Sequence, residues 1–449
     1  MSSEPSPSVL VVRGCDVLRV PETGECWVVT NQDIVVVGNV IESISPTGGS
    51  VDPAAQIIDG RGLLATPGLV NTHTHSPMVL FRGAAEDVPV AAWFNERVWP
   101  MESNLTEDDV AAGAMLACAE MIQGGTTAFA DHYFFEEAIA RSVASAGLRA
   151  NIAPTYFSSR GREALDATVE FAGRWNGAAG GRISTSMGPH APYTVDDDDL
   201  AEVAAHARRL GIRVHIHASE NIDQTRSSLQ RRGITPIEVL SRTGVLDAGV
   251  LIAHGCGIVP SDYELLGTHS ATTSVVSCPK VYLKHALAPL TPVGDLQQLG
   301  VGVAAGTDGA AGHNTLDMWE SMRLLAMTQK YQTTDAMVMT TSDTVRLAMR
   351  GGAAALGLGD PDLRPGGPAD IVLVDLGGSH HQPVHDARAA LVYGMQTSDV
   401  RTVIVDGQVL MRDRQLLTID LPEVIADVVD RVKRLTTIRE GRSVQCYNP

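Results

Sequence analysis

The sequence has few cysteines, and they follow no pattern. The six cysteines in 449 residues are scattered, and none belongs to a Cys-x-x-Cys pair. This spacing excludes a disulfide framework and a structural zinc site built from cysteine pairs. The first residues also lack the basic and apolar regions of a signal peptide. We therefore expect a cytoplasmic protein in a reducing compartment.

Basic residues and long apolar runs are scarce as well. The chain has 34 lysines and arginines against 52 acidic residues, which gives a formal net charge of −18. An acidic surface repels phosphate backbones and anionic lipid headgroups, so neither nucleic acid nor membrane is an expected partner. No uncharged apolar run approaches the length needed to span a bilayer. A hydrophobic content of 44% still provides enough apolar material for a full core.

The middle of the chain alternates between apolar runs and amphipathic stretches, such as 109–123 and 200–210. This alternation predicts an α/β protein with a closed parallel (β/α)₈ TIM barrel. A doubly wound open sheet is the alternative, but no Gly-x-Gly-x-x-Gly turn follows the first strand to support it. The predicted barrel strands are 65–70, 126–130, 150–156, 183–187, 213–216, 250–253, 273–277 and 301–305.

Short β-branched runs occur at both ends of the chain. They lie at 9–12, 27–30 and 34–37 and again at 369–375 and 400–405. The dipeptide Asp406-Gly407 is typical of a hairpin turn. We expect the two ends, 1–65 and 361–449, to form one small composite β-sandwich domain. The catalytic barrel would then occupy 66–360, inserted between them.

Polar residues follow five of the predicted barrel strands. Barrel enzymes carry their chemistry at the carboxyl ends of the strands. These polar ends come together only if the barrel closes. They are His73-Thr74-His75, Gly188-Pro189-His190, His215 to Glu220, Ala253-His254 and Gly306 to Gly309.

The pair His73 and His75 is a candidate metal site. Residues i and i+2 of a strand share a face, so both imidazoles can bind one divalent ion. Imidazoles also fill polar barrel interiors, which is the alternative for the pair alone. His217 can add a third nitrogen and Asp308 a carboxylate, a set that suits zinc first and iron second. The alternative for Asp308 is a helix N-cap.

The same strand ends offer groups for proton transfer. A divalent ion lowers the pKa of a bound water, which makes hydroxide available at pH 7. Glu220 would be the proton shuttle, and His254 would orient the water. A surface glutamate and a core histidine are the structural alternatives for these two. His190 is placed to touch a substrate ring, and His215 is interpreted as core filling because the His217-x-x-Glu220 spacing favours the later histidine.

Taken together, these segments resemble the amidohydrolase superfamily over nearly the whole chain. Within it, the chain is similar to the S-adenosylhomocysteine/5′-methylthioadenosine deaminase branch, with chlorotriazine hydrolases as further relatives. Binuclear relatives commonly have a carbamylated lysine at the end of the fourth strand, and its absence here argues for a single metal. The matching strings are 67–78, 82–87, 99–102, 188–193, 217–220, 253–254 and 306–311.

The resemblance implies roles for further residues. Glu102 would receive the ribose hydroxyls of a nucleoside, and Trp93 would cover it, although ordinary packing is the alternative for Trp93. Either Arg160 or Arg162 would meet the amino-acid carboxylate of S-adenosylhomocysteine, or be a solvated loop charge. The metal ligands would be His73, His75, His217 and Asp308, with Glu220, His254 and Asp308 managing protons.

The chain departs from that branch in two segments near the expected pocket mouth. Ser277-Cys278-Pro279-Lys280 replaces the usual Ser-Asn pattern after the seventh strand, and Ala310 to Asn314 differs after Asp308. His313 and Lys280 are therefore either pocket residues of altered specificity or solvent-facing substitutions. The departures leave the metal chemistry untouched and weaken only the substrate assignment.

These observations predict a hydrolytic deaminase that acts on a small nucleoside-like substrate. S-adenosylhomocysteine is the first candidate, followed by methylthioadenosine and adenosine. The alternatives are another nitrogen heterocycle, such as a chlorotriazine, guanine or a pterin, and a non-catalytic barrel scaffold. One divalent ion, zinc or else iron, is the expected cofactor, and a homo-oligomer is the expected assembly.

Overall fold

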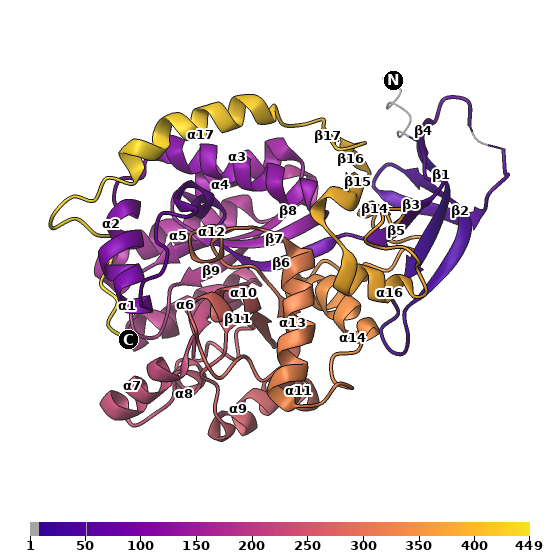
Figure 1. Cartoon of the computed structure of the whole chain (residues 1–449). Helices are drawn as coiled ribbons and strands as arrows, with labels where there is room; N and C mark the ends of the chain where they lie inside the picture. The colour runs from indigo at the N-terminus through magenta and orange to yellow at the C-terminus, as the bar shows by residue number, and fades with distance from the viewer. Residues whose placement is uncertain (1–8, 51) are drawn as a thin grey trace.

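The computed structural model describes residues 9–50 and 52–449. The first eight residues, on which the expectation of no signal peptide rests, lie outside the described residues. Figure 1 shows two units: a large barrel surrounded by helices, and a smaller sheet beside it. Within the described ranges, no helix combines the length and the apolar character needed to cross a bilayer.

The large unit is an eight-stranded parallel barrel, as the alternating apolar runs predict. Its strands pair in chain order from β6 to β13. The barrel closes between the segment after the last strand and the first strand. A parallel bridge joins Thr74 to Asp308 there, and the Asp308 amide donates to the His73 carbonyl at 2.9 Å. The strands are β6 (Leu69–Thr74), β7 (Thr126–Tyr133), β8 (Arg149–Tyr156), β9 (Ile183–Pro189), β10 (Arg213–Ala218), β11 (Val250–His254), β12 (Thr273–Ser277) and β13 (Gly302–Ala305).

Helices cover the outside of the barrel, and α6 (Asp197–Leu210) shows why they form. Its buried residues Leu200, Val203, Ala204 and Ala207 recur at helical spacing and face the sheet. Acidic residues occupy its first turn and arginines its last, as the helix dipole favours. The other outer helices are α3 (Glu107–Gln123), α4 (Glu136–Ala146), α5 (Arg162–Trp175), α7 (Ile222–Arg232), α8 (Pro236–Arg242), α9 (Tyr263–Thr268), α11 (Val293–Gln298), α13 (Met318–Thr333), α14 (Thr341–Arg346) and α15 (Gly352–Leu356).

Short helices lie at the carboxyl end of the barrel, above the strands. The segment from α1 to α2, residues 90–102, forms a roof there, and we call it the roof segment. It is continuous helical structure that includes a π-helical stretch, Trp93–Val98. The short helices are α1 (Val90–Ala92), α2 (Trp99–Glu102), α10 (Pro279–Lys284) and α12 (Ala310–His313).

Both ends of the chain build the small unit, which confirms the composite domain. Strand β5 (Leu63–Pro67) from the first end pairs antiparallel with β14 (Ile371–Asp375) from the second. All nine strands join one mixed sheet, whose apolar face forms a separate core. The exact domain boundaries stay a prediction. The remaining strands are β1 (Val9–Arg19), β2 (Trp27–Val37), β3 (Val40–Pro46), β4 (Gln56–Asp59), β15 (Val400–Val405), β16 (Gln408–Arg412) and β17 (Gln415–Leu416), and the short helix α16 (Ala387–Ala389) lies beside them.

One detail of the predicted strands is wrong. The runs 27–30 and 34–37 are not separate strands but parts of the single strand β2. The polar residues between them do not end the strand, because Asn31 adopts a left-handed conformation with φ of 52° and the pairing with β1 continues beyond an irregularity in its register. An irregularity of this kind absorbs an extra residue without ending the ladder.

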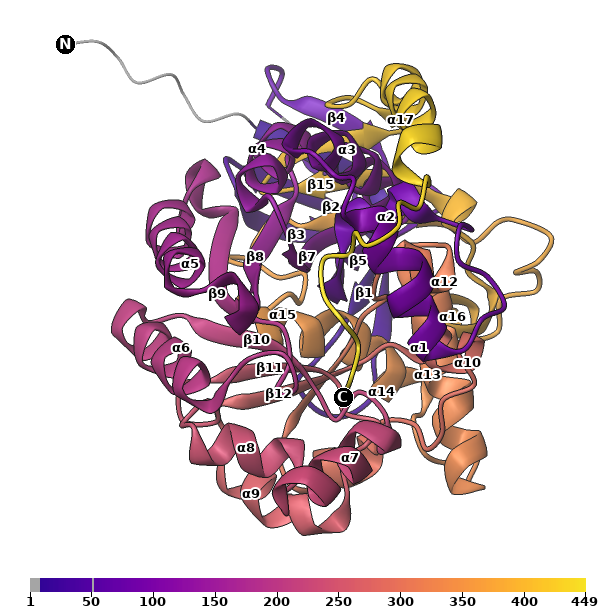
Figure 2. The ribbon, with the colours of Figure 1, turned by 90° about the vertical axis from the view of Figure 1, so that its left-hand side faces the viewer.

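The chain returns to the barrel through α17 (Leu421–Leu435), which packs on α3. Arg431 donates to the buried carboxylate of Asp109 at 2.9 Å, and Arg434 also bonds to it. Burial alone would raise the pKa of Asp109, but these hydrogen bonds and those from Thr106 lower it to about 2. Figure 2 shows the yellow chain after α17 running across the face of the barrel to the C-terminus.

Candidate active site

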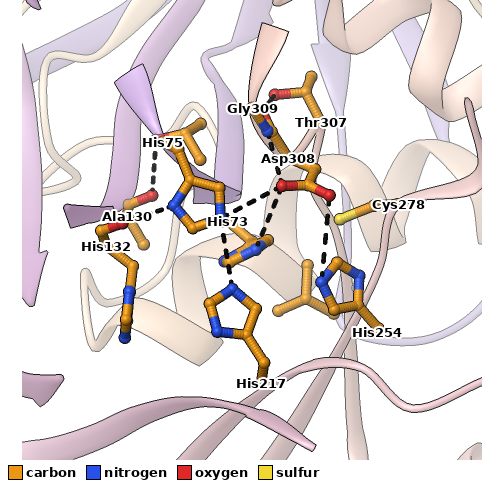
Figure 3. A network of polar contacts seen from close by, with 12 residues as sticks. His73, His75, Ala130, His132, His217, His254, Cys278, Thr307, Asp308 and Gly309 are labelled. Atoms are coloured by element: carbon orange, nitrogen blue, oxygen red, sulfur yellow. Dashed lines mark hydrogen bonds and ion pairs between the residues drawn. The ribbon is translucent and has the colours of Figure 1, made fainter. Parts of the chain in front are cut away.

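Histidines and an aspartate from several strand ends meet at the carboxyl end of the barrel (Figure 3). Two groups that could hold an ion share His73: one adds His75 and His217, and the other adds His254 and Asp308. His73 and His75 come from β6, His217 comes from β10, and Asp308 follows β13. Asp308 Oδ1 lies 3.3 Å from His75 Nε2 and 3.7 Å from His73 Nε2. His217 Nε2 lies 3.3 Å from His75 Nε2. The four predicted ligands therefore point at one common centre.

The outer nitrogen of each imidazole is fixed by a neighbour. Nδ1 of His75 donates to the carbonyl of His132, and Nδ1 of His217 donates to the carbonyl of His190 at 2.8 Å. His73 Nδ1 lies 2.9 Å from Nε2 of His215. This arrangement orients metal-ligating histidines in many proteins, because it leaves Nε2 free to face the ion. His215 supports His73 from behind, in agreement with its interpretation as core filling.

The positions of these atoms fit a divalent cation. Because His75 and His217 each use Nδ1 as the donor, their neutral rings present two lone pairs to one another at 3.3 Å. His73 Nε2 is buried and has no hydrogen-bond partner among the described residues. Tetrahedral zinc with bonds near 2.0–2.2 Å places its ligands about 3.4 Å apart. A cation at the centre would turn the facing lone pairs and the carboxylate into ligands.

Protonation states favour the same interpretation. Burial lowers the pKa values of His73, His75 and His217, so the imidazoles are neutral, as metal ligands must be. Burial removes the Asp308 carboxyl from water and raises its pKa to about 7. A bound cation would oppose that shift by stabilising the carboxylate.

The backbone at the site adopts conformations that are uncommon for side chains other than glycine. Ser219, His254 and Asp308 have φ of 48°, 77° and 74°. Such residues cluster at functional sites, where the surrounding structure holds them. The residue after Asp308 is Gly309, and the packing leaves no room for a side chain at this position. An added Cβ would lie 2.3 Å from the sulfur of Met78. Its amide donates to Asp308 Oδ1 at 2.6 Å and helps to fix that carboxylate.

His254 and Glu220 lie on the same cavity wall as the metal group. His254 Nε2 is 4.0 Å from Asp308 Oδ2, on the side away from His75 (Figure 3). Glu220 is clamped by Gln224, whose side-chain amide donates to Glu220 Oε2 and whose carbonyl oxygen accepts from the Glu220 amide at 3.0 Å. Burial raises the pKa of Glu220 to about 7. A carboxyl with that pKa can accept and donate a proton at neutral pH.

A cavity of about 70 Å³ lies directly above this group, and aromatic side chains surround it. Trp93 and Phe94 of the roof segment, His190 after β9 and Glu102 at the end of α2 all face it. The predicted residues Trp93, Glu102 and His190 therefore lie with the metal group around one space. Other lining residues are Met78, Val90, Trp99, His132, Tyr133, Phe134, Thr155, Phe157, Val281, Tyr282, His285 and Leu287.

Glu102 has an incomplete set of hydrogen bonds. The hydroxyl of Tyr133 donates to its Oε1 at 2.5 Å, whereas Oε2 is buried and finds no donor in the described part of the chain. Burial raises the pKa of Glu102 to about 8, although the hydrogen bond from Tyr133 acts in the opposite direction. A buried acceptor without a donor lowers the stability of the folded protein. Such a group is typical of a site where a ligand supplies the missing donor.

The remaining predicted residues lie elsewhere. Arg160 lines a second, larger hollow that adjoins the cavity, with its guanidinium 5.7 Å from the ring centre of Phe134. Arg162 is exposed and pairs with Glu202 and, at 3.2 Å, with Asp166. His313 is fully buried in α12. Neither His313 nor Arg162 is among the described residues that line the cavity.

Lys280 is also engaged outside the cavity. Its amine donates to Thr315 at 2.7 Å and to Glu320 at 2.5 Å. The ion pairs of Arg162, the burial of His313 and the hydrogen bonds of Lys280 do not support a direct contact of these residues with a substrate. The substrate roles of Arg162 and His313 therefore stay predictions.

Sequence reasoning missed several residues around the cavity. His132 accepts or donates a hydrogen bond with Thr155 at 2.8 Å, and its Nε2 has no partner within the described residues. Tyr133 holds Glu102 in place. A signal for both was present, because Asp131-His132-Tyr133 directly follows the predicted strand 126–130, as the other polar strand ends do.

A further group of possible ligands lies in the second half of the chain, outside the barrel. His380 and His381 both contact Oδ2 of Asp399, at 2.9 and 3.1 Å. These separations are those of hydrogen bonds and are shorter than the spacing of zinc ligands. We therefore interpret this group as a hydrogen-bonded support for the turn that Asp399 caps.

Comparisons with known proteins agree with this geometry. The chain is 39% identical over 431 residues to the 5-methylthioadenosine/S-adenosylhomocysteine deaminase of Pelotomaculum thermopropionicum, and the match covers 95% of this chain and 98% of the relative. A solved structure of an adenosine deaminase from Xanthomonas campestris with bound zinc has a TM-score of 0.90 at 31% identity, covering 96% and 99% of the two chains.

An atrazine chlorohydrolase of Arthrobacter aurescens, solved in complex with zinc, has the same fold, with a TM-score of 0.84 at 22% identity over 94% of this chain and 100% of the other. Residues 64–410 match the model of the amidohydrolase family. The chain therefore belongs to the amidohydrolase family and is a metal-dependent aminohydrolase.

Proposed function

We propose that the protein removes the 6-amino group of adenosine derivatives by hydrolysis, with S-adenosylhomocysteine as its first substrate. The observation that carries the proposal is one cavity that combines the metal group, the buried carboxyl of Glu220 and the unpartnered oxygen of Glu102. The similarity to a relative named for two 5′-thioadenosines supports the choice of substrate class.

The proposed ligands are His73, His75, His217 and Asp308, and zinc is the proposed ion. When bound, the ion would lower the pKa of a water and so supply a nucleophile at neutral pH. Zinc in the similar adenosine deaminase structure supports this choice of ion. His254, beside Asp308, would hold the attacking water in line with the purine carbon.

Glu220 would carry protons through the reaction. Its carboxylate would take a proton from the attacking water as the bond between the water oxygen and the purine carbon forms, and would deliver it to the ring nitrogen next to that carbon. Asp308 or Glu220 would then take the remaining proton from the new hydroxyl and pass it to the amine, and the C–N bond breaks as ammonia leaves. One water is consumed, and the products are the inosine derivative and ammonia. A pKa near neutrality suits a group that must both accept and donate.

Glu102, Trp93 and His190 would hold the nucleoside. Glu102 Oε2 can accept from a ribose hydroxyl, and this contact would favour the carboxylate form that burial disfavours in the free protein. Trp93 covers the cavity from the roof segment, and His190, directly after β9, lines it as well. A bare heterocycle has no hydroxyls to use Glu102, which is why we favour a nucleoside over a triazine.

The 5′ side of the substrate would extend into the adjoining hollow. This hollow has a volume of about 910 Å³ and shares Glu102, Phe134 and Thr155 with the cavity. We propose Arg160 as the contact of the amino-acid carboxylate, because it lines the hollow whereas Arg162 is paired with Glu202 on the outside. The glutamates of the same wall, such as Glu136, would suit the amino group of a zwitterion.

A substrate panel tests the proposed function. We expect the purified zinc-loaded protein to release one ammonia per molecule of S-adenosylhomocysteine, with a decrease of absorbance near the adenine maximum. Methylthioadenosine and adenosine should react as well, and adenine should react poorly because it lacks the ribose. Turnover of a chlorotriazine, guanine or a pterin without turnover of any adenosine derivative would contradict the proposal.

Glu102→Gln tests the ribose contact. The amide keeps the shape of the side chain but loses the charge that strengthens a hydrogen bond, so KM for adenosine derivatives should rise by about 10- to 100-fold. The metal content and kcat should change little. Glu170→Gln is the matched control, because Glu170 is exposed on α5 and lines neither the cavity nor the adjoining hollow. An unchanged KM in the Glu102 variant would show that the ribose binds elsewhere.

A further inference from the structure

The last residues of the chain lie along the roof segment and end beside α7. Figure 2 shows this tail, residues 436–449, crossing in front of the barrel toward α7. Along its course the Val444 amide donates to the Trp99 carbonyl at 3.3 Å, and Arg442 donates to the Ser103 carbonyl at 3.2 Å. The tail therefore follows the segment that covers the cavity.

Tyr447 makes the most extensive contacts of the tail. Its ring lies parallel to that of Phe94, with ring centres 4.6 Å apart and planes inclined by 8°, and it meets Tyr193 edge-on at 5.7 Å. Its amide donates to the Asn95 side chain at 2.8 Å, and the Asn95 amide group donates to its carbonyl at 3.1 Å. Phe94 in turn lines the cavity. One residue thus joins the roof segment to the loop after β9.

The hydroxyl of Tyr447 extends this connection to the other wall of the cavity. Asn221 donates to it at 3.3 Å, and the side chain of Asn221 also accepts from the Gln224 amide at 2.9 Å. Gln224 clamps Glu220 through both atoms of its side-chain amide. Tyr447 therefore lies at the outer end of the hydrogen-bonded group that holds the proposed proton shuttle.

The small volume of the cavity makes the position of the roof segment important for substrate entry. The space above the metal group is about 70 Å³, whereas sites for small molecules occupy about 300–1,000 Å³. A nucleoside does not fit until some of the covering side chains move. The roof segment covers the cavity with Val90, Trp93, Phe94 and Trp99, and the contacts that hold its outer surface down include those of Tyr447.

We propose that Tyr447 is a positioning residue, which fixes the roof segment over the bound substrate and holds the Asn221–Gln224–Glu220 group in register with it. The kinetic part of this inference rests on the proposed function. The aromatic ring carries most of the effect, since the parallel stack on Phe94 and the contact with Tyr193 are closer to ideal than the 3.3 Å hydrogen bond. Its role is to order the site; it transfers no proton itself.

The experiment compares Tyr447→Ala, Tyr447→Phe and the control Cys446→Ala in the zinc-loaded full chain. Cys446 is the exposed neighbour on the same tail. In Tyr447→Ala we expect hydrogen exchange to rise by about tenfold in residues 90–104 and 219–225, and KM for S-adenosylhomocysteine to rise by about three- to tenfold with a smaller change in kcat. Tyr447→Phe keeps the ring, so exchange in 90–104 and KM should stay within about twofold of the wild type. Exchange in 219–225 should rise less than in Tyr447→Ala, because only the hydrogen bond from Asn221 is lost. Cys446→Ala should match the wild type.

The outcomes separate this proposal from the proposed function. If the wild type deaminates no adenosine derivative, the function is wrong, but the exchange data still test Tyr447. Wild-type exchange and KM in Tyr447→Ala would overturn the positioning role. Faster exchange throughout the barrel strands of that variant, or an equal loss in Tyr447→Phe, would also overturn it, because the residue would then support the fold in general or act through its hydroxyl.

Discussion

His73→Ala is expected to purify without stoichiometric zinc and to lose deaminase activity by about 10⁴-fold or more. The side chain is fully buried, its Nε2 faces the common centre, and Asp308 Oδ1 lies 3.7 Å from it. Without this ligand the ion is held by fewer donors, and the pKa of water returns toward its bulk value, so hydroxide is scarce at pH 7. Metal analysis of the purified protein and an ammonia assay measure the two losses.

His269→Ala is the control for this substitution, because His269 lies at the end of α9 and pairs with Asp247 near the surface. It should keep both metal and activity. Thermal unfolding should show that the His73 variant is folded, with a lower midpoint because a bound ion stabilises only the native state. A metal-free His73 variant that still deaminates its substrate would show that the proposed ligand set is wrong.

Glu220→Gln is expected to lower kcat by about 10³-fold while the protein keeps its zinc and KM changes by less than about threefold. Positioned acid–base catalysis typically contributes 10²- to 10⁴-fold, and the amide cannot carry a proton. The side chain of Glu220 lies on the cavity wall and accepts a hydrogen bond from Gln224. The amide of the substituted glutamine fills the same space as the carboxyl. Steady-state kinetics and metal analysis together separate this outcome from the loss of a ligand.

The pH dependence provides a second measurement for Glu220. Burial raises the pKa of Glu220 to about 7, so its protonation state changes across the neutral range and should affect the wild-type rate there. The residual rate of the Gln variant should not show that titration. Glu238→Gln, at a surface pair with Arg242, is the matched control and should leave the profile unchanged. A Gln variant with near wild-type kcat would assign the shuttle to another group, with Asp308 the first alternative.

The barrel was predictable because its pattern is local. Each buried parallel strand needs a short apolar run, and each covering helix needs one apolar face, as 200–210 shows. The meeting of the candidate ligands was predictable for a related reason: His73 and His75 share a face, and a closed barrel brings strand ends together wherever they lie in the sequence. Their role as ligands stays a prediction. The exact domain limits, the oligomeric state and the native metal stay predictions.

Residues whose positions depend on loops were beyond the sequence. Arg160 and Arg162 are close together in the chain and equally charged, yet one lines the hollow beside the cavity and the other pairs with Glu202 outside it. The sequence left His313 between a pocket residue and a solvent-facing one; its side chain is buried in α12, and its substrate role stays a prediction. No periodic pattern links a loop residue to a direction in space, so the choice between such residues is made only when the loop packs.

By itself, the sequence predicted the eight alternating strands and the small domain built from both chain ends, because these follow from local strand and helix patterns. It also indicated, at strand ends, four candidate ligands for an ion, and their role as ligands stays a prediction. Only the tertiary structure decided which groups surround that ion: His132 and Tyr133 on the wall, the unpartnered oxygen of Glu102, and Tyr447 on the roof. Tyr447 bonds to Asn95 across 352 positions of the chain, and no local pattern connects the two. They meet because the chain folds back over the barrel, and contacts between such distant segments are set by packing in three dimensions.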